Sequence, residues 1–260
     1  MHSYPTSGDL RVQIEQHVAT IEFSRPPNNH FDEALIGALA DVMEALDTDA
    51  SCRAIVLASD GKVFCAGADF SAPQYNDGRP LNAGMLYKKG LRMFRTRKPV
   101  VAAIQGAAIG GGLGLALAAD FRVTCDEARF SANFARLGTH PGFGLTATLP
   151  RLVGPQQAAL LFYTGRRING TEAVRIGLAD MLVRQAEVRG AAWQIAAEIA
   201  ASAPCSVMSL RETLRRGLAD EVEAATEREF VEQHWQFQLE DFQEGKAAVA
   251  QRRPPVFKGE

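Results

Sequence analysis

Two glycine-rich turns are the segments of this 260-residue chain most suited to chemistry, and they offer backbone N–H groups as hydrogen-bond donors rather than reactive side chains. Their sequences are VFCAGAD at residues 63–69 and GAAIGGGLGLALAAD at residues 106–120. Each follows an apolar run of strand character, and the second continues into an Ala/Leu-rich stretch of helix character. Amides at the start of a helix are unpaired and lie at the positive end of its dipole. Two such turns that converge would supply a pair of donors for a developing oxyanion.

Other motifs of catalysis or ligand binding are absent from the sequence. The glycines at 110–114 do not complete GxGxxG, because leucine falls at the third place. Gly61-Lys62 lacks the earlier glycine and the Ser or Thr of a phosphate-binding loop. There is no GxSxG or HExxH, and the four cysteines are too scattered for a disulfide framework or a CxxC metal pair. The sequence therefore predicts neither a serine hydrolase nor a metal site.

Hydrophobic periodicity predicts the elements that position the two turns. Apolar or alternating runs predict strands at 10–15, 17–23, 54–58, 100–104 and 121–124. Helical spacing predicts helices at 31–47, 82–95, 191–202, 204–216 and 220–242. Thr171 is expected to cap a further helix and Gly177 to follow its last turn. Pro, Asn and Gly at 71–80 indicate a mobile loop.

The composition is typical of a globular protein with one catalytic core, at 47% hydrophobic and 22% charged residues. A net charge of −2 gives no reason to expect nucleic acid or an anionic membrane as a partner. No window approaches the roughly 20 apolar residues that a membrane span needs, and the first residues lack the apolar segment of a signal peptide. We therefore expect a cytoplasmic protein with no nucleic-acid or membrane partner.

The two turns and several shorter motifs, in this order, resemble the enoyl-CoA hydratase/isomerase (crotonase) superfamily. The shorter motifs are RPPNN at 25–29, KPV at 98–100, LGTHPG at 137–142, TGR at 164–166 with EA and GL following, and FKG at 257–259. The resemblance covers nearly the whole chain. It implies an α/β fold of the ClpP/crotonase type, a spiral of stacked ββα units at residues 1–190. A C-terminal helical trimerisation region would follow at 191–260, giving a homotrimer or homohexamer.

The resemblance also implies a site for an acyl-CoA thioester, with coenzyme A entering as part of the substrate and no separate cofactor. By position, the oxyanion donors are the backbone N–H groups of Ala68 and Gly111. Ala66, Asp69 and Gly110 belong to the same two turns and are expected to contact the substrate. Small residues suit these places because a side chain there would block the thioester.

Basic side chains near these motifs are candidates for binding the CoA phosphates. Arg25 and Lys62 lie close to the first turn in the sequence, and Lys258 would reach the nucleotide bound by a neighbouring subunit. The alternative for each is a solvated surface charge.

The carboxylates of the family's hydratases are missing from this chain. Gly114 stands three residues after the middle glycine, where the family places its first glutamate. Phe134 stands at the second glutamate position and is expected to line the substrate pocket. Gly142 aligns with an aspartate that some relatives use. His140 is the candidate replacement, since an imidazole titrates near neutral pH; the alternative is a loop histidine with a solvated ring.

These residues predict an enzyme of acyl-CoA, fatty acid or aromatic-acid metabolism whose conventional hydratase activity is doubtful. Isomerisation, hydrolysis, decarboxylation and C–C cleavage by a lyase remain open. The alternative is a non-catalytic acyl-CoA-binding protein, a pseudoenzyme or regulator that kept the pocket and lost the chemistry.

Overall fold

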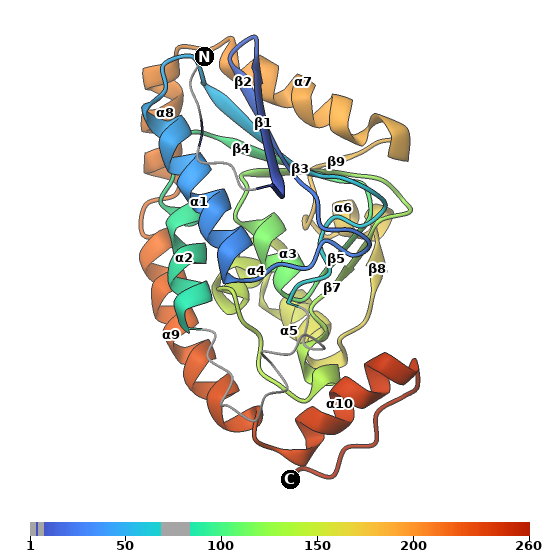
Figure 1. Cartoon of the computed structure of the whole chain (residues 1–260). Helices are drawn as coiled ribbons and strands as arrows, with labels where there is room; N and C mark the ends of the chain where they lie inside the picture. The colour runs from blue at the N-terminus through green and yellow to red at the C-terminus, as the bar shows by residue number, and fades with distance from the viewer. Residues whose placement is uncertain (1–3, 5–7, 69–83) are drawn as a thin grey trace.

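The computed structural model describes residue 4, residues 8–68 and residues 84–260, and its strands form two sheets (Figure 1). The larger sheet has the order β1-β2-β3-β4-β6-β9, with β1 and β2 antiparallel and the other neighbours parallel. Its strands are β1 (Leu10–Glu15), β2 (Val18–Phe23), β3 (Ala54–Ser59), β4 (Val100–Ile104), β6 (Phe121–Thr124) and β9 (Met181–Leu182). The smaller sheet has the order β5-β7-β8, comprising β5 (Ala107–Ile109), β7 (Arg129–Ser131) and β8 (Ile168–Asn169).

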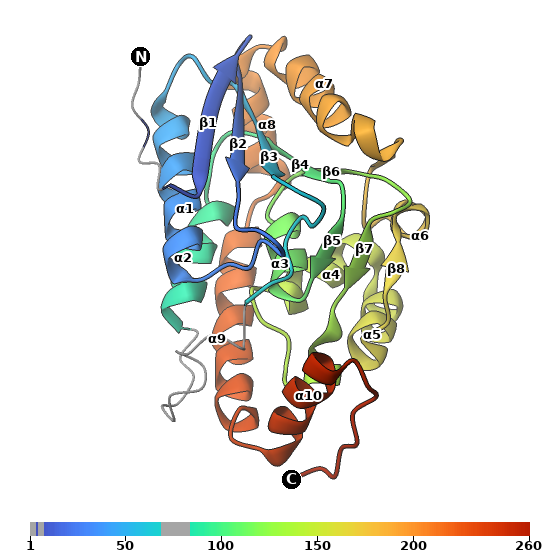
Figure 2. The same ribbon diagram turned by 45° about the vertical axis from the view of Figure 1, so that its right-hand side comes forward.

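Helices surround both sheets, and α3 lies at the centre of the molecule (Figure 2). The first five are α1 (Glu33–Thr48), α2 (Gly84–Phe94), α3 (Gly111–Leu117), α4 (Leu145–Val153) and α5 (Pro155–Thr164). The later ones are α6 (Gly170–Arg175), α7 (Val188–Ala200), α8 (Pro204–Leu214), α9 (Leu218–Gln236) and α10 (Glu240–Gln251), with short 3-10 helices η2 (Asn133–Leu137) and η3 (Gln185–Glu187). Helix α7 packs on β2, β3, β4 and β6, while α1 lies on the other side of this sheet.

The central strands are continuous apolar runs, and this composition places them in the core. Every residue of β3 and β4 is buried, as expected for parallel strands covered on both faces. Helix α1 buries one apolar stripe, and Asp32 caps its first turn by accepting a hydrogen bond from Leu35 N at 2.9 Å. The predicted strands and the helix at 31–47 are thus confirmed with shifts of one or two residues at their ends.

Two sequence-based predictions about the later helices are wrong. The helix expected at 220–242 breaks after Gln236, because Leu239 adopts extended backbone angles before α10 begins. The side chain that caps α6 belongs to Asn169 and accepts from Glu172 N, whereas the Thr171 hydroxyl donates to Asp126. Gly177 does follow the end of α6, with φ at +80°.

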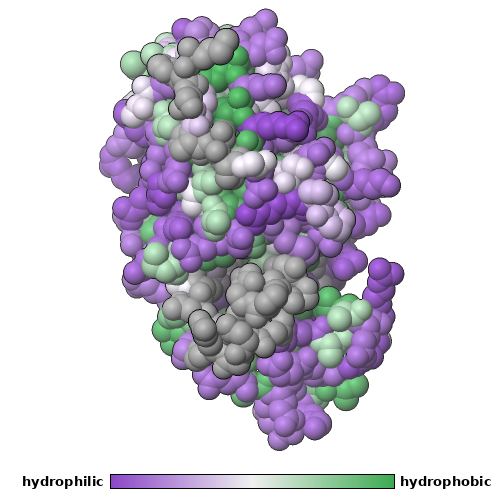
Figure 3. All heavy atoms as spheres, in the orientation of Figure 1, coloured by the Kyte–Doolittle hydropathy of each residue, from purple (hydrophilic) through white to green (hydrophobic). Residues whose placement is uncertain are grey.

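The predicted boundary between residues 190 and 191 falls inside α7, which packs on the larger sheet. The division into two regions stays a prediction. The predicted loop at 71–80 lies outside the described residues. Among the described residues, no helix is both long and apolar enough to cross a membrane. Figure 3 shows a mostly hydrophilic face with hydrophobic residues scattered across it.

Candidate active site

The two glycine turns predicted to converge lie directly against each other. A Cβ placed on Gly67 would be 2.9 Å from Ile109 O and 3.2 Å from Gly111 N, so only glycine fits this contact. Gly67 also has φ at +82°, a conformation that favours glycine. Cys65 joins the turns through its backbone, donating to Ala107 O at 2.9 Å and accepting from Ile109 N at 3.0 Å.

The two candidate donor amides form no hydrogen bond with any residue that the structure describes. Within residues 8–68 and 84–260, neither Ala68 N–H nor Gly111 N–H has a hydrogen-bond partner. Gly111 is the first residue of α3, and the first bond of that helix runs from Leu113 N to Gly110 O at 3.0 Å. The structure therefore brings two N–H groups, both without a partner among the described residues, from distant parts of the sequence to adjacent turns.

Residues 28–31 run alongside the first turn and hold its backbone. Ala66 N donates to Asn28 O at 3.1 Å, and Phe31 N donates to Gly67 O at 3.0 Å. Phe31 and Ala68 form an isolated parallel bridge, a pairing that leaves the Ala68 N–H unused. The early motif at 25–29 thus leads into the segment that braces the turn.

The side chain of Asn29 links the motif at 25–29 to the backbone at residues 60–63, where the first turn begins. It is 2% exposed, and its Nδ2 donates to Asp60 O and Val63 O, both at 2.7 Å. Its Oδ1 accepts from Arg25 N at 2.7 Å. All polar atoms of this buried amide are therefore used to fix the path of the chain before the first turn.

Aromatic rings fill the space beside the second turn. Cζ of Phe31 lies 2.5 Å from where a Cβ on Gly111 would be. Cβ of Phe143 lies 2.8 Å from the corresponding place on Gly114, which is predicted to stand at the family's first glutamate position. The two rings pack at 5.5 Å between centroids, and Phe143 adopts φ of +64°. A bulky residue in this region of backbone space is rare and marks a constrained position.

The other two acid positions are occupied as well. Phe134 is buried in η2, with Cζ 3.7 Å from where a Cβ on Gly110 would be. A Cβ on Gly142 would overlap Oη of Tyr87 and lie 2.8 Å from Gln233 Nε2. That tyrosine donates to Gln233 Oε1 at 2.5 Å. None of the three positions carries a carboxylate, and neighbouring side chains fill the space beside Gly114 and Gly142.

Helix α9 holds His140 in place from one side. The His140 carbonyl accepts from Gln233 Nε2 at 2.9 Å, and its N–H donates to Gln236 Oε1. Its ring Nδ1 lies 2.9 Å from Pro141 O, and because a carbonyl only accepts, Nδ1 carries the proton. Nε2 has no partner within the described parts of the chain. The role of His140 as a base stays a prediction.

Glu229 supports the loop after His140, and nothing in the sequence singled it out. It is fully buried, and its carboxylate accepts from Gly144 N at 2.8 Å, Thr146 N at 2.9 Å and Thr146 Oγ1 at 2.7 Å. Burial raises the pKa of this carboxyl, and the three donors oppose that rise. Several other acids share its helix, so its special position depends on the packing of α9 against α4.

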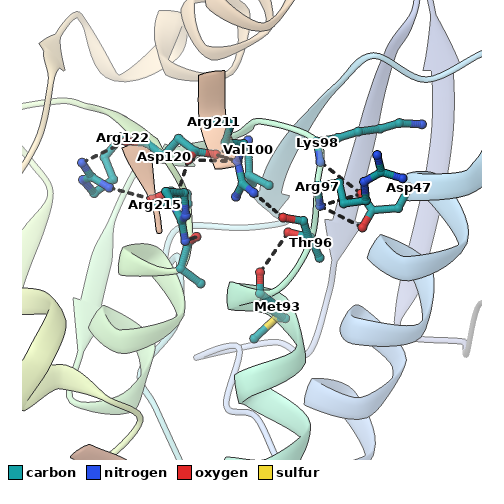
Figure 4. Close-up of polar contacts among 12 residues, drawn as sticks. Asp47, Met93, Thr96, Arg97, Lys98, Val100, Asp120, Arg122, Arg211 and Arg215 are labelled. Carbon is teal, nitrogen blue, oxygen red and sulfur yellow. Dashed lines mark hydrogen bonds and ion pairs between the residues drawn. The ribbon is translucent and has the colours of Figure 1, made fainter. Parts of the chain in front are cut away.

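The far end of α3 is anchored by a buried ionic cluster (Figure 4). Asp120 accepts from Val100 N at 2.8 Å, Arg211 Nε at 2.9 Å and Arg215 Nη1 at 2.8 Å. Arg122 is 2% exposed, and burial lowers its pKa and that of Arg215. The cluster joins α8 to β4 and to the chain that follows α3, so it fixes the helix that presents Gly111.

The predicted phosphate ligands are spread over the molecule. Arg25 is paired with Asp9 at 2.7 Å and Asp32 at 2.8 Å, so two carboxylates neutralise its charge. Lys62 is exposed and forms no ion pair with any described residue. Their roles in binding CoA stay predictions.

Lys258 lies on the tail after α10, beyond the contacts that surround the two turns. Its Nζ is 3.6 Å from Glu240, and its side chain is 66% exposed. Its contact with the nucleotide of a neighbouring subunit stays a prediction. Asp69, the last predicted substrate contact of the first turn, lies outside the described residues.

The sequence and the fold both match known proteins. The enoyl-CoA hydratase/isomerase family profile matches residues 13–260. A probable enoyl-CoA hydratase of Bacillus subtilis (strain 168) is 34% identical over 255 residues, covering 96% of this chain and 99% of that protein. Carnitinyl-CoA dehydratase of Escherichia coli (strain K12) is 35% identical over 259 residues, covering 97% and 99%.

Solved structures agree. An enoyl-CoA hydratase/isomerase from Pseudoalteromonas atlantica T6c superposes with a TM-score of 0.86 at 29% identity, covering 96% of this chain and all of that one. A carnitinyl-CoA hydratase from Mycobacterium avium gives 0.85 at 30%, covering 98% and 100%. The fold is therefore the α/β crotonase fold, as predicted. The chain belongs to the enoyl-CoA hydratase/isomerase family.

Proposed function

We propose that this chain is an acyl-CoA enzyme that binds a thioester with the carbonyl oxygen between the N–H groups of Ala68 and Gly111. Family membership supports acyl-CoA binding. The observation that carries the proposal is the contact of the two turns. A Cβ placed on Gly67 would be 3.2 Å from Gly111 N, and neither candidate amide is bonded to a described residue.

Such a pair of donors stabilises negative charge that develops on the thioester oxygen, in an enolate or in a tetrahedral intermediate. Backbone donors held in advance cost no reorganisation when the charge forms, and one donor is worth about 10²–10³ in rate. The amides are therefore the groups that this chain brings to the reaction itself.

The reaction that we propose does not use a pair of carboxylates. Gly114, Phe134 and Gly142 carry none, and the space beside Gly114 and Gly142 is taken by Phe143 and Tyr87. This arrangement favours isomerisation, hydrolysis, decarboxylation or C–C cleavage, each of which passes through a charged thioester oxygen. His140, with Nε2 available, is the proposed base where the reaction needs one.

Hydration or dehydration is the second candidate. Two relatives favour it, a probable enoyl-CoA hydratase and a carnitinyl-CoA dehydratase, each about one third identical to this chain. A non-catalytic acyl-CoA-binding protein is the third. Such a protein would bind the thioester through the two amides and would not convert it. The absence of carboxylates at positions 114, 134 and 142 favours this candidate.

One experiment separates the three. Crotonyl-, octanoyl-, malonyl- and benzoyl-CoA are each tested for binding by calorimetry and for turnover by mass spectrometry, with the matching free acids and CoA as controls. The proposal expects every bound thioester to exceed its free acid in affinity and at least one to be converted. Equal affinity of thioester and acid would overturn the carbonyl-binding role, and efficient crotonyl-CoA hydration would favour the second candidate.

We also propose assembly into a homotrimer or homohexamer. Large apolar side chains on α8 and α9 are exposed in the single chain, Leu214 at 74%, Leu210 at 62% and Trp235 at 49%. Burial of such side chains between subunits would remove them from water. Light scattering in solution tests the subunit number, and a monomer would contradict the proposal.

A further inference from the structure

The carbonyl oxygen of Gly67 accepts two hydrogen bonds from residues that are adjacent in the chain. Phe31 N donates to it at 3.0 Å, and His30 Nδ1 lies 3.1 Å from it. Because a carbonyl oxygen only accepts, Nδ1 of His30 carries its proton. The imidazole is therefore held as an N–H donor toward the first glycine turn, in a half-buried position.

The two bonds orient the peptide group that ends in the Ala68 amide. A trans peptide is planar, so the N–H of Ala68 lies opposite the C=O of Gly67. Fixing the carbonyl at one end of this plane fixes the direction of the N–H at the other. Glycine has the greatest backbone freedom of any residue, so the Gly67–Ala68 peptide is a group whose rotation needs to be restrained.

We propose that His30 is a positioning residue for the Ala68 amide, which it aims at the thioester oxygen through the Gly67 carbonyl. This inference rests on the proposed function of that amide. The same bond polarises the peptide and makes its N–H a stronger donor, since hydrogen bonds in a chain reinforce one another. Without the imidazole, Phe31 N is the donor to this carbonyl that remains among the described residues.

The test measures the polarisation of a bound thioester carbonyl. Acetyl-CoA labelled with ¹³C at the carbonyl is bound to the protein, and isotope-edited infrared difference spectra give the shift of its C=O stretch to lower frequency. In wild-type protein the bound carbonyl should shift relative to free acetyl-CoA. His30→Leu removes one of the two donors that the described residues supply to Gly67 O, and we expect it to reduce the shift.

Two further variants distinguish orientation from packing. His30→Asn keeps an N–H near the Nδ1 place and should retain the shift. His17→Leu is the matched control: His17 is another loop histidine whose Nδ1 lies 3.0 Å from a backbone carbonyl, that of Ser51, at the opposite end of β2. It should leave the shift unchanged. Free CoA does not engage the amides, so its affinity should be the same in all four proteins.

The outcomes separate the inference from the proposed function. No carbonyl shift in the wild-type protein would overturn the proposed function together with this inference. A wild-type shift that persists in His30→Leu would overturn the role of His30 and leave the proposed function standing. A shift lost equally in His30→Leu and His30→Asn would indicate that the imidazole acts by ring packing, and the inference would be wrong.

Discussion

The two sides of the candidate site present very different groups. One side, which we call the amide wall, consists of the N–H groups of Ala68 and Gly111. The other, the filled wall, consists of positions 114, 134 and 142, which are predicted to correspond to the family's acid positions and which carry no carboxylate here. Phe143 and Tyr87 occupy the space beside two of these positions.

This contrast reflects how each wall is encoded. Every residue except proline supplies a backbone N–H, so the amide wall depends on the path of the chain and on the absence of side chains near it. A carboxylate depends on one codon and is lost in one substitution. A family member can therefore change its proton chemistry while its carbonyl-polarising groups stay in place.

The largest expected effect concerns hydration of crotonyl-CoA. Each well-placed general acid or base contributes about 10²–10⁴-fold, so loss of both should leave hydration several orders of magnitude below that of a relative with both glutamates. Absorbance at the enoyl-thioester band measures the rate, with such a relative assayed alongside. Hydration at the relative's rate would remove the contrast between the walls.

A side chain introduced at Gly111 should prevent the amide wall from binding the thioester carbonyl. Gly111→Val puts a Cβ 2.5 Å from Phe31 Cζ and blocks the space in front of the amide, so thioester turnover or tight binding should fall by about 10²–10³ or more. Gly190→Val is the control, because a Cβ at Gly190 meets no atom within 4 Å. Circular dichroism checks that both variants fold, and equal kinetics in the two would show that the amide of Gly111 is not a donor.

A carboxylate introduced at position 114 should destabilise the fold unless the side chain of Phe143 is removed. Gly114→Glu forces a side chain against Phe143 Cβ at 2.8 Å and buries a charge, so it should destabilise the fold by about 1–3 kcal/mol or more. In a Phe143→Gly background, which also suits φ of +64°, the same change should cost less. Denaturant unfolding of all four proteins gives the coupling, expected at about 0.5–3 kcal/mol. Equal costs in both backgrounds would mean that Phe143 does not fill this position.

The smallest effect concerns thiol reactivity beneath the amide wall. Burial raises the pKa of Cys65 to about 12 and that of Cys52 to about 11, so both stay protonated and unreactive near pH 8. Cys205 is exposed and should react rapidly with a disulfide reagent. Cys205→Ser should remove the fast phase. Fast labelling of Cys65 in the folded protein would show that the amide wall opens readily.

The sequence predicted well that the two glycine turns meet, and it predicted the surroundings of positions 114, 134 and 142 only in part. The role of the Ala68 and Gly111 amides as oxyanion donors stays a prediction. Apolar runs marked β3 and β4, and the glycines after them located the turns, because such patterns are local. The sequence also shows that positions 114 and 134 carry no carboxylate, while their correspondence to the family's acid positions stays a prediction. The side chain that fills the space beside Gly114 could not be predicted from the sequence. Phe143 reaches Gly114 because a separate loop folds against it, and no pattern within either segment indicates this contact.

In the C-terminal half, too, local sequence patterns did not predict features that depend on long-range contacts. Nothing in the sequence around Leu239 breaks a helix as glycine or proline would, so the separation of α9 from α10 could not be foreseen. Glu229 stood among several acids on one helix, and only its burial beneath Gly144 distinguishes it. Long-range contacts, rather than local preferences, decide these features.

The contacts of α9 also set the order in which the protein is completed during synthesis. Glu229 follows Gly144 by 85 residues, and Gln233 follows His140 by 93. A ribosome adds roughly 5–20 residues per second. The loop at residues 140–144 is therefore synthesised several seconds before Glu229 and Gln233, which hold it. The filled wall is thus among the last parts of the nascent chain to take its native form, whereas the brace between residues 28–31 and the first turn can form early.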